Sequence, residues 1–270
     1  MAKARRNMHE TGPSAAPPLV AERLAKTFDD GAVEVPVIAD LSFTLNAGEI
    51  VSIVGPSGCG KTTLLNVVCG LTPASSGSVL WHGAAPQGMP GRVGYMLQKD
   101  MLLPWRTALS NVTLGMEING KVGAPERDKA RVLLDRLGLH GFADRYPATF
   151  SGGMRQRVAL ARTLVNDPEV LLFDEPFAAL DFQTKLLLEA DTVRLVREEG
   201  RSLLCITHDI EEAVSISDRV IVLTKRPTRA KAVYEIDLGV QTADMMEARQ
   251  SPRFNDHVRA IWRDLEVSGT

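Results

Sequence analysis

The chain has 270 residues, of which 24% are charged and 44% are hydrophobic, and its formal net charge is -2. These values are ordinary for a soluble globular protein, and the length suits one large domain or one domain with an inserted subdomain. Basic excess is the usual sign of nucleic-acid binding, so this charge gives no reason to expect a nucleic-acid partner. No apolar run approaches the roughly twenty residues that span a bilayer, and we expect any membrane contact to come through a partner.

The N-terminal segment, residues 1–18, begins with basic residues and continues with polar, small and proline residues. It has no apolar stretch that could act as a signal sequence, and we expect a flexible tail. Residues 20–28 and 37–45 then alternate in the manner of antiparallel strands, and residues 77–82 suggest another strand. These segments predict a small antiparallel β flank beside the core.

The most informative segment is residues 55–62, which reads Gly-Pro-Ser-Gly-Cys-Gly-Lys-Thr and follows the apolar run 50–54. Glycines in such a loop let backbone N–H groups turn toward phosphate oxygens, the lysine adds a positive charge, and the threonine hydroxyl can ligate Mg²⁺. A helix predicted over 61–69 would point the positive end of its dipole at the same anion. The predicted nucleotide-binding residues of this segment are Gly55, Pro56, Ser57, Gly58, Cys59, Gly60, Lys61, Thr62 and Thr63.

Short apolar runs recur after the loop, at residues 170–173, 203–206 and 220–223. Runs without alternation suit central strands of a parallel sheet that is covered on both faces. Helical patterns at residues 153–165 and 182–199 fall between these runs. This order predicts an α/β fold with a parallel-sheet core.

Between about residues 99 and 150 the pattern changes to helical segments broken by proline and glycine, with residues 126–137 the clearest amphipathic helix. We expect an inserted α-helical subdomain there. Residues 226–270 form a short C-terminal extension that ends in a predicted helix over residues 255–265. The three cysteines have no paired or metal-ligand spacing, and we expect reduced thiols in apolar surroundings.

Two further segments carry candidate chemistry. Asp174 and Glu175 follow the apolar run 170–173, where Asp174 could anchor Mg²⁺ and Glu175 could act as general base for an attacking water. An acidic pair after a strand is by itself more often a loop or cap feature, but the phosphate loop reverses that preference. Residues 151–153, Ser-Gly-Gly before a predicted helix, offer N–H groups and a hydroxyl to an anion. The alternative is a serine N-cap followed by flexible glycines.

Together these motifs resemble the ABC transporter ATPases in order and spacing over roughly residues 20–225. The matching motifs are residues 55–62, Gln98, residues 151–153 with Arg155-Gln156-Arg157, Asp174-Glu175, Ala179-Leu180-Asp181 and His208. The resemblance implies a RecA-like P-loop NTPase fold over residues 19–225, with ATP and Mg²⁺ as cofactors. It also implies a homodimer in which ATP lies between the phosphate loop of one copy and Ser151, Gly152 and Gly153 of the other.

The resemblance assigns further roles. Gln98 would sense Mg²⁺ and the attacking water, His208 would bind the γ-phosphate, Asp181 would lie at the dimer interface, and Phe28 would stack on adenine. Without the family context, these residues would be read as a solvated glutamine, a structural histidine, a helix cap and a core ring. The implied catalytic residues are Glu175, His208, Gln98 and Lys61, and the implied metal ligands are Thr62, Gln98 and Asp174. The signature departs from the family at Phe150 and Met154, but its serine and glycine donors remain.

Single ATPase chains of this kind resemble importer subunits that assemble with separate permeases and, indirectly, with a solute-binding protein. Residues 98–112 and 177–184 look like the branch that serves nitrate, sulfonate and taurine. The apolar segment around Trp105 could be core, although a tryptophan and an arginine together are typical of an interface. The resemblance places the subunit at the cytoplasmic face of the inner membrane, bound to the permease.

Two other functions compete with an importer subunit. A soluble ABC protein acting mechanically on ribosomes or DNA would usually carry two ATPase units, a long coiled-coil insert or basic arms, and the sequence shows none of these. A P-loop kinase or GTPase would not explain the Ser-Gly-Gly helix start together with Asp181 and His208.

Overall fold

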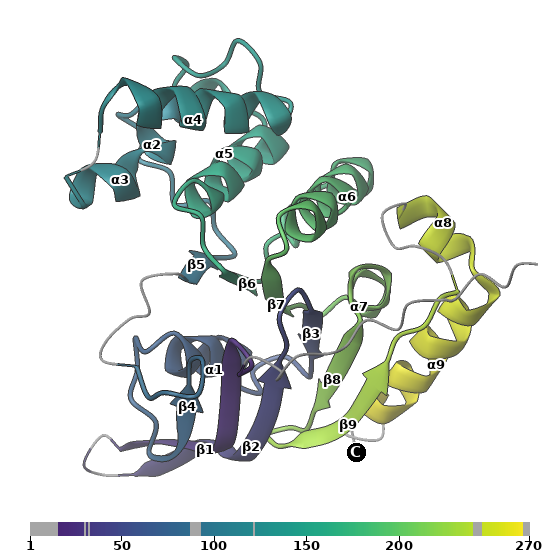
Figure 1. Cartoon of the computed structure of the whole chain (residues 1–270). Helices are drawn as coiled ribbons and strands as arrows, with labels where there is room; N and C mark the ends of the chain where they lie inside the picture. The colour runs from purple at the N-terminus through teal and green to yellow at the C-terminus, as the bar shows by residue number, and fades with distance from the viewer. Residues whose placement is uncertain are drawn as a thin grey trace, which may run out of the picture.

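The computed structural model describes residues 16–29, 31, 33–86, 93–120, 122–239 and 245–266. Most of the predicted N-terminal tail, residues 1–15, lies outside this part. The described chain forms two sheets with helices around them (Figure 1). The smaller sheet is antiparallel and has the order β2-β1-β4. Its strands are β1 (Leu19–Asp29), β2 (Glu34–Leu45) and β4 (Ser76–Leu80).

The larger sheet has the order β5-β6-β7-β3-β8-β9. Its first five strands run parallel, and β9 pairs antiparallel with β8. The strands are β3 (Ile50–Val54), β5 (Val93–Met96), β6 (Val170–Asp174), β7 (Ser202–Ile206), β8 (Arg219–Leu223) and β9 (Ala230–Glu235). Every residue of β3, β6 and β7 is buried, which explains why these strands show no polar alternation.

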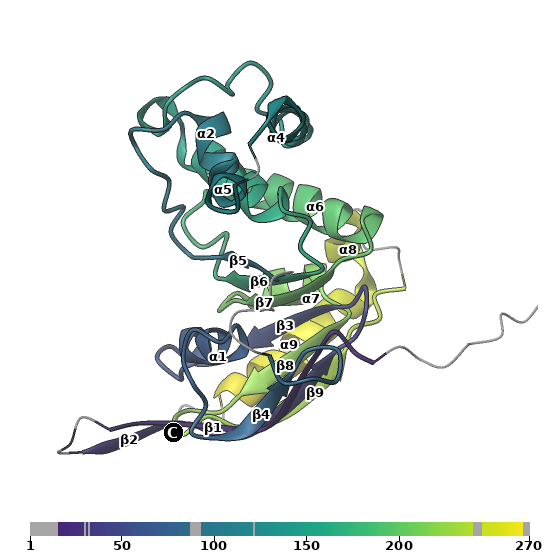
Figure 2. The ribbon, with the colours of Figure 1, turned by 60° about the vertical axis from the view of Figure 1, so that its left-hand side comes forward.

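The core sheet is covered on both faces (Figure 2). On one face, α1 (Lys61–Val68) and the antiparallel sheet pack against strand residues such as Val51 and Leu204. On the other face, α5 (Gly152–Leu164) and α6 (Phe182–Glu198) pack against residues such as Phe173 and Cys205. Because the carboxyl ends of the parallel strands meet at one edge, the loops that follow β3, β5, β6 and β7 are brought together there.

The helical region contains α2 (Ala108–Val112), α3 (Leu114–Ile118), α4 (Ala124–Arg136) and a 3₁₀ turn (Pro147–Thr149). In both views these helices stand with α5 above the core sheet, opposite the antiparallel sheet (Figures 1 and 2). Ala130, Leu133 and Leu134 form the buried face of α4 at helical spacing. The predicted fold class, a P-loop NTPase core with an antiparallel flank and an inserted helical subdomain, is confirmed.

The C-terminal part packs onto the core sheet. Beyond α7 (Ile210–Ile216) and β9 lie α8 (Met245–Gln250) and α9 (Pro252–Glu266), and α9 packs against α7, β8 and β9. The helix predicted over residues 255–265 therefore exists, but it begins three residues earlier, at Pro252. Within the described residues, none of the helices has the length and apolar character needed to cross a membrane.

Candidate active site

The predicted phosphate loop connects β3 to α1 at the carboxyl edge of the core sheet. Gly58 and Gly60 have φ angles of 73° and 112°, in a region that residues with a side chain rarely adopt. A Cβ on Gly60 would also lie 2.5 Å from Cγ1 of Val37. Thr228 donates a hydrogen bond from its hydroxyl to the Cys59 carbonyl and so ties the loop to the segment after β8. The loop conformation therefore requires the glycines that the sequence supplies.

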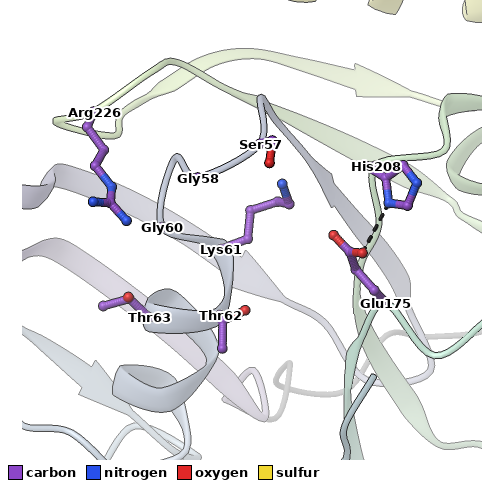
Figure 3. A pocket seen from close by; sticks show the side chains of 9 residues that line it. All are labelled: Ser57, Gly58, Gly60, Lys61, Thr62, Thr63, Glu175, His208 and Arg226. Carbon is purple, nitrogen blue, oxygen red and sulfur yellow. Dashed lines mark hydrogen bonds and ion pairs between the residues drawn. The ribbon is translucent and has the colours of Figure 1, made fainter. Parts of the chain in front are cut away.

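A pocket of about 430 Å³ opens above this loop (Figure 3). Its lining residues are Ser57, Gly58, Gly60, Lys61, Thr62, Thr63, Glu175, His208 and Arg226. Lys61 is buried, and its Nζ donates to the carbonyls of Gly55 at 2.9 Å and Pro56 at 3.3 Å. Figure 3 shows its amine between Ser57 and the Glu175–His208 pair. A positive charge fixed inside a loop of backbone N–H groups suits a polyphosphate.

Asp174 ends β6 and is buried, and its carboxylate forms a side-chain hydrogen bond with Thr62. Burial raises the pKa of the Asp174 carboxyl above its ordinary value, and the hydrogen bond with Thr62 opposes that rise. A hydroxyl oxygen and a buried carboxylate in contact form the hard oxygen donor set that Mg²⁺ prefers. The two residues fit the predicted metal site.

Three of the four predicted catalytic residues come from the ends of neighbouring strands, because Gln98 follows β5, Glu175 follows β6 and His208 follows β7. Oε2 of Glu175 accepts a hydrogen bond from Nε2 of Gln98 at 3.4 Å and lies 3.1 Å from Nδ1 of His208. Glu175 has a φ of 48°, and its backbone N–H donates to the Ile206 carbonyl at 2.8 Å. The structure therefore gathers the three side chains around one carboxylate beside the phosphate loop.

Several predicted residues do not line this pocket. Gly55, Pro56, Cys59, Gln98 and Asp174 belong to the phosphate loop or to the strand ends beside it, whereas Ser151, Gly152, Gly153 and Asp181 belong to the starts of α5 and α6. Within this chain, Ser151 caps α5 by accepting from the Met154 N–H. Asp181 caps α6 by accepting from the Thr184 N–H at 3.0 Å. Hydrogen bonding with Thr184 lowers the pKa of the Asp181 carboxyl. Within one copy of the chain, Ser151 and Asp181 therefore act as helix caps.

Phe28 also lies outside the pocket lining. The residue is 45% exposed, and Nζ of Lys26 lies over the ring, 4.8 Å from its centroid. Phe28 is therefore not a core residue. The alternative reading of this ring as core is wrong.

Sequence reasoning missed Arg226, which lines the pocket. Arg226 follows β8, the neighbour of β3 in the core sheet, so the edge that carries the phosphate loop also carries this arginine. The pair Lys225-Arg226 after an apolar run was the available signal.

All three cysteines are free and buried, as expected. Burial raises the pKa of the Cys59 thiol, although Lys61 opposes the effect, and it also raises the pKa values of Cys69 and Cys205. The thiol form is favoured at each position, which disfavours a redox role for Cys59 in the loop.

Comparison with known proteins identifies the family. The model of the family described as "ABC transporter" matches residues 38–178. The chain belongs to the ABC transporter family. This ABC chain is similar to MJ0412 of Methanocaldococcus jannaschii, named an uncharacterized ABC transporter ATP-binding protein, with 43% identity over 82% of each chain.

Other relatives of this ABC protein carry importer names. The taurine import ATP-binding protein TauB of Roseobacter denitrificans is 40% identical and matches over 86% of this chain and 88% of that protein. The aliphatic sulfonates import ATP-binding protein SsuB 2 of Burkholderia cenocepacia is 39% identical over 89% of this chain and 90% of that protein.

Solved structures agree with the fold. The dimeric cassette MJ0796 has a TM-score of 0.73 and 30% identity, and the match covers 81% of this chain and 99% of that one. A dimeric post-hydrolysis state of MJ0796 bound to ADP and Pi gives a TM-score of 0.72. The present chain is an ATP-binding subunit of the ABC type, and ABC subunits are ATPases coupled to transport.

Proposed function

We propose that this chain hydrolyses ATP to energise an importer of small sulfonates, such as taurine, or of related anions such as nitrate. It works as a pair of copies bound to a permease at the cytoplasmic face of the inner membrane, with a solute-binding protein delivering the solute. The observation that carries the hydrolytic part is the meeting of Gln98, Glu175 and His208 beside the phosphate loop. The import names of relatives near 40% identity support the transport part and the solute class.

The side chains in and beside the pocket have separate roles in this proposal. Glu175 accepts the proton of the attacking water, because its carboxylate is the common partner of Gln98 and His208. His208 and Gln98 fix the direction of that carboxylate and of the water, and Lys61 holds the phosphates. Thr62, Asp174 and Gln98 would hold Mg²⁺, which when bound offsets the negative charge of the phosphate oxygens.

A second copy completes the nucleotide site. Ser151 and Gly152 are exposed at the N-terminus of the 13-residue helix α5 and do not line the pocket of their own chain. A helix N-terminus with a hydroxyl and free N–H groups favours an anion. We infer that Ser151, Gly152 and Gly153 contact the ATP held by the partner copy, and that Asp181 lies at the same interface. The exposed Phe28 ring stacks on the adenine.

The proposed permease contact is the segment that leads away from Gln98. Trp105 in this segment is 71% exposed, and Met101 is also exposed. The buried Asn111 side chain fixes the segment by bonding the backbone of residues 103, 106 and 107. Arg162 of α5 donates to the carbonyls of residues 100 and 101. An exposed aromatic ring on a rigid support suits an interface, and the segment links the partner to Gln98, which bonds Glu175 at the pocket.

The hydrolytic role is tested with Glu175→Gln. The amide cannot accept the proton, so hydrolysis is expected to fall at least about 100-fold, while ATP binding and nucleotide-dependent dimerisation persist. The matched control is Glu34→Gln, at an exposed position at the start of β2. ATPase assays and size-exclusion chromatography with ATP provide the measurements. Hydrolysis by Glu175→Gln at the parent rate would falsify the assignment of Glu175 as base.

The transport role needs a separate test. Cells that lack this chain are expected to lose uptake of labelled taurine or ethanesulfonate and to keep uptake of sulfate. Unchanged uptake of both sulfonates would contradict the solute class but not the ATPase assignment. Recovery of the tagged chain with ribosomes or DNA, and without any membrane protein, would contradict the importer.

A further inference from the structure

A group of charged side chains lies behind His208, between α6, α7 and α8. We call it the ion cluster, and its members are Lys185, Glu189, Asp209, Glu212 and Arg249. Nζ of Lys185 lies 2.7 Å from Oδ2 of Asp209, 2.6 Å from Oε2 of Glu212 and 3.7 Å from Oε1 of Glu189. Nη2 of Arg249 lies 3.5 Å from Oε2 of Glu189. None of these residues lines the nucleotide pocket.

Lys185 holds the ion cluster together. Its side chain is 13% exposed, and the carboxylates of Glu189 and Glu212 are almost wholly buried. Burial opposes the charged ammonium, but the Glu212 and Asp209 carboxylates outweigh it and raise the pKa of Lys185. An ammonium has three N–H donors, and here three carboxylates surround it. The position of each carboxylate is therefore defined by this one cation.

Asp209 connects the ion cluster to the active site. Its Oδ1 accepts from the Glu212 N–H at 3.1 Å and caps α7, while its Oδ2 accepts from Lys185. Its own N–H donates to the Thr207 hydroxyl at 3.0 Å. Burial would raise the pKa of Asp209, yet the bonds from Lys185 and from the Glu212 N–H lower it, so the carboxylate stays charged. Both oxygens of the residue next to His208 are thus engaged.

The His208 ring has little support of its own. It is 61% exposed and meets Glu175 at 3.1 Å. Its position therefore depends on the backbone of the loop between β7 and α7, which Asp209 fixes. Lys185 lies one helical turn after Asp181, and its N–H donates to the Asp181 carbonyl at 2.9 Å. One cation thus joins the start of α6 to the His208 loop.

We propose that Lys185 is a positioning residue for ATP hydrolysis, which holds Asp209 and thereby keeps the His208 imidazole against Glu175. This inference rests on the proposed function, because it assigns Lys185 a part in the hydrolytic step. In this proposal, α6 also connects Asp181, at its exposed N-terminus, to the position of the His208 ring. Lys185 acts through Asp209 and touches neither nucleotide nor water.

The test compares Lys185→Met with Lys185→Arg and with the control Lys129→Met. Lys129 on α4 forms a surface ion pair with Asp167, and it lies far along the chain from the ion cluster. Lys185→Met is expected to lower kcat about 10- to 100-fold, because small misplacements of a reacting group have effects of that size. The KM for ATP is expected to stay within about twofold, since the phosphate loop is intact. Lys185→Arg should recover most of kcat, and Lys129→Met should match the parent.

A purely structural role of Lys185 would lower the melting temperature without this split between kcat and KM. A folded Lys185→Met protein with the parent's kcat would overturn the inference, as would an Arg variant no better than the Met variant. Asp209→Asn keeps the oxygen that caps α7 and removes the charge that Lys185 holds. A variant that combines Lys185→Met with Asp209→Asn should not lose kcat by the product of the two single losses, because both substitutions remove the same Lys185–Asp209 contact. Multiplying losses would contradict action through Asp209.

If Lys185→Met does not fold, Asp209→Asn alone decides, and a parental kcat in that variant overturns the inference. Glu175→Gln is measured in the same assay. An inactive parent, or an unaffected Glu175→Gln, refutes the proposed function itself. An active parent that Glu175→Gln silences, with parental kcat in the Lys185 variants, refutes only the role of Lys185.

Discussion

Glu189 in the ion cluster makes the stability of the protein depend on pH. Its side chain is fully buried on α6, and neither carboxylate oxygen has a hydrogen-bond partner among the described residues. Lys185 and Arg249 lie at ion-pair distances of 3.7 and 3.5 Å. Burial, together with the nearby Glu212 carboxylate, raises the pKa of Glu189 from 4.5 to about 7 despite these two cations. Folding therefore favours the protonated form of Glu189 relative to the unfolded chain.

The sign of the effect follows from this order of pKa values. Because the folded state binds the proton more tightly than the unfolded chain, Glu189 contributes its full stabilisation below pH 4.5 and loses it as the pH rises through 7. One pKa unit corresponds to about 1.4 kcal/mol, so the total is about 3 kcal/mol. Glu189→Gln cannot titrate and imitates the protonated acid. Between pH 5 and 8 the parent should therefore lose about 2 to 3 kcal/mol more unfolding free energy than the variant, because part of the effect already lies below pH 5.

The assay is urea unfolding followed by circular dichroism at pH 5, 6, 7 and 8, for parent and variant side by side. Glu198→Gln on the same helix, with a half-exposed side chain, is the control and should keep the parent's pH dependence. Glu212, whose carboxyl pKa burial also raises, is present in all three proteins. Parallel curves for the parent and Glu189→Gln would refute the reasoning, as would a parent that becomes relatively more stable toward pH 8.

Two further predictions concern the nucleotide site. Gly153→Ala should lower the unfolding free energy by about 1–3 kcal/mol, because its Cβ would lie 2.4 Å from Cγ2 of Thr184. Thr184→Ser should restore much of the loss, whereas Gly152→Ala, whose Cβ meets only Nη2 of an arginine at 3.9 Å, should unfold like the parent. Arg226→Ala should raise the KM for ATP several-fold with little change in kcat, because Arg226 lies beside the phosphate loop on the side away from Glu175 and His208. Arg229→Ala, an exposed neighbour paired with an aspartate, is the control, and equal KM values for the two variants would contradict this role.

The core of the fold was predictable because its signals are local. The strands at 50–54, 170–174 and 202–206 are wholly buried, so their sequences are predominantly apolar and stand out from the helices between them. The phosphate loop is a contiguous motif whose glycines are needed by the backbone itself. Glu175 could be placed because it directly follows such a strand, and adjacent parallel strands end at one edge. The role of His208, two residues after β7, depended on the family resemblance.

The C-terminal part was less predictable because its elements depend on distant partners. Strand β9 is only half buried and is held by pairing with β8, so its sequence lacks a continuous apolar run. Helix α8 has six residues, too few to form alone, and it is held by the buried Met245 and Ala248 and by the ion pairs of Arg249. Such contacts leave no periodic pattern in the sequence.

The ion cluster shows the same limit at the level of single charges. Lys185 and Glu189 are spaced i,i+4 on a helix, a pattern that usually indicates a solvated surface pair worth a few tenths of a kcal/mol. In the folded protein α7 lies beside them, and Arg249 of α8 reaches both Glu189 and Glu211. Removal of water strengthens the attraction between Lys185 and its carboxylates. Helix α8 therefore reaches the ion cluster through the contact of Arg249 with Glu189, and Glu189 in turn lies beside Lys185.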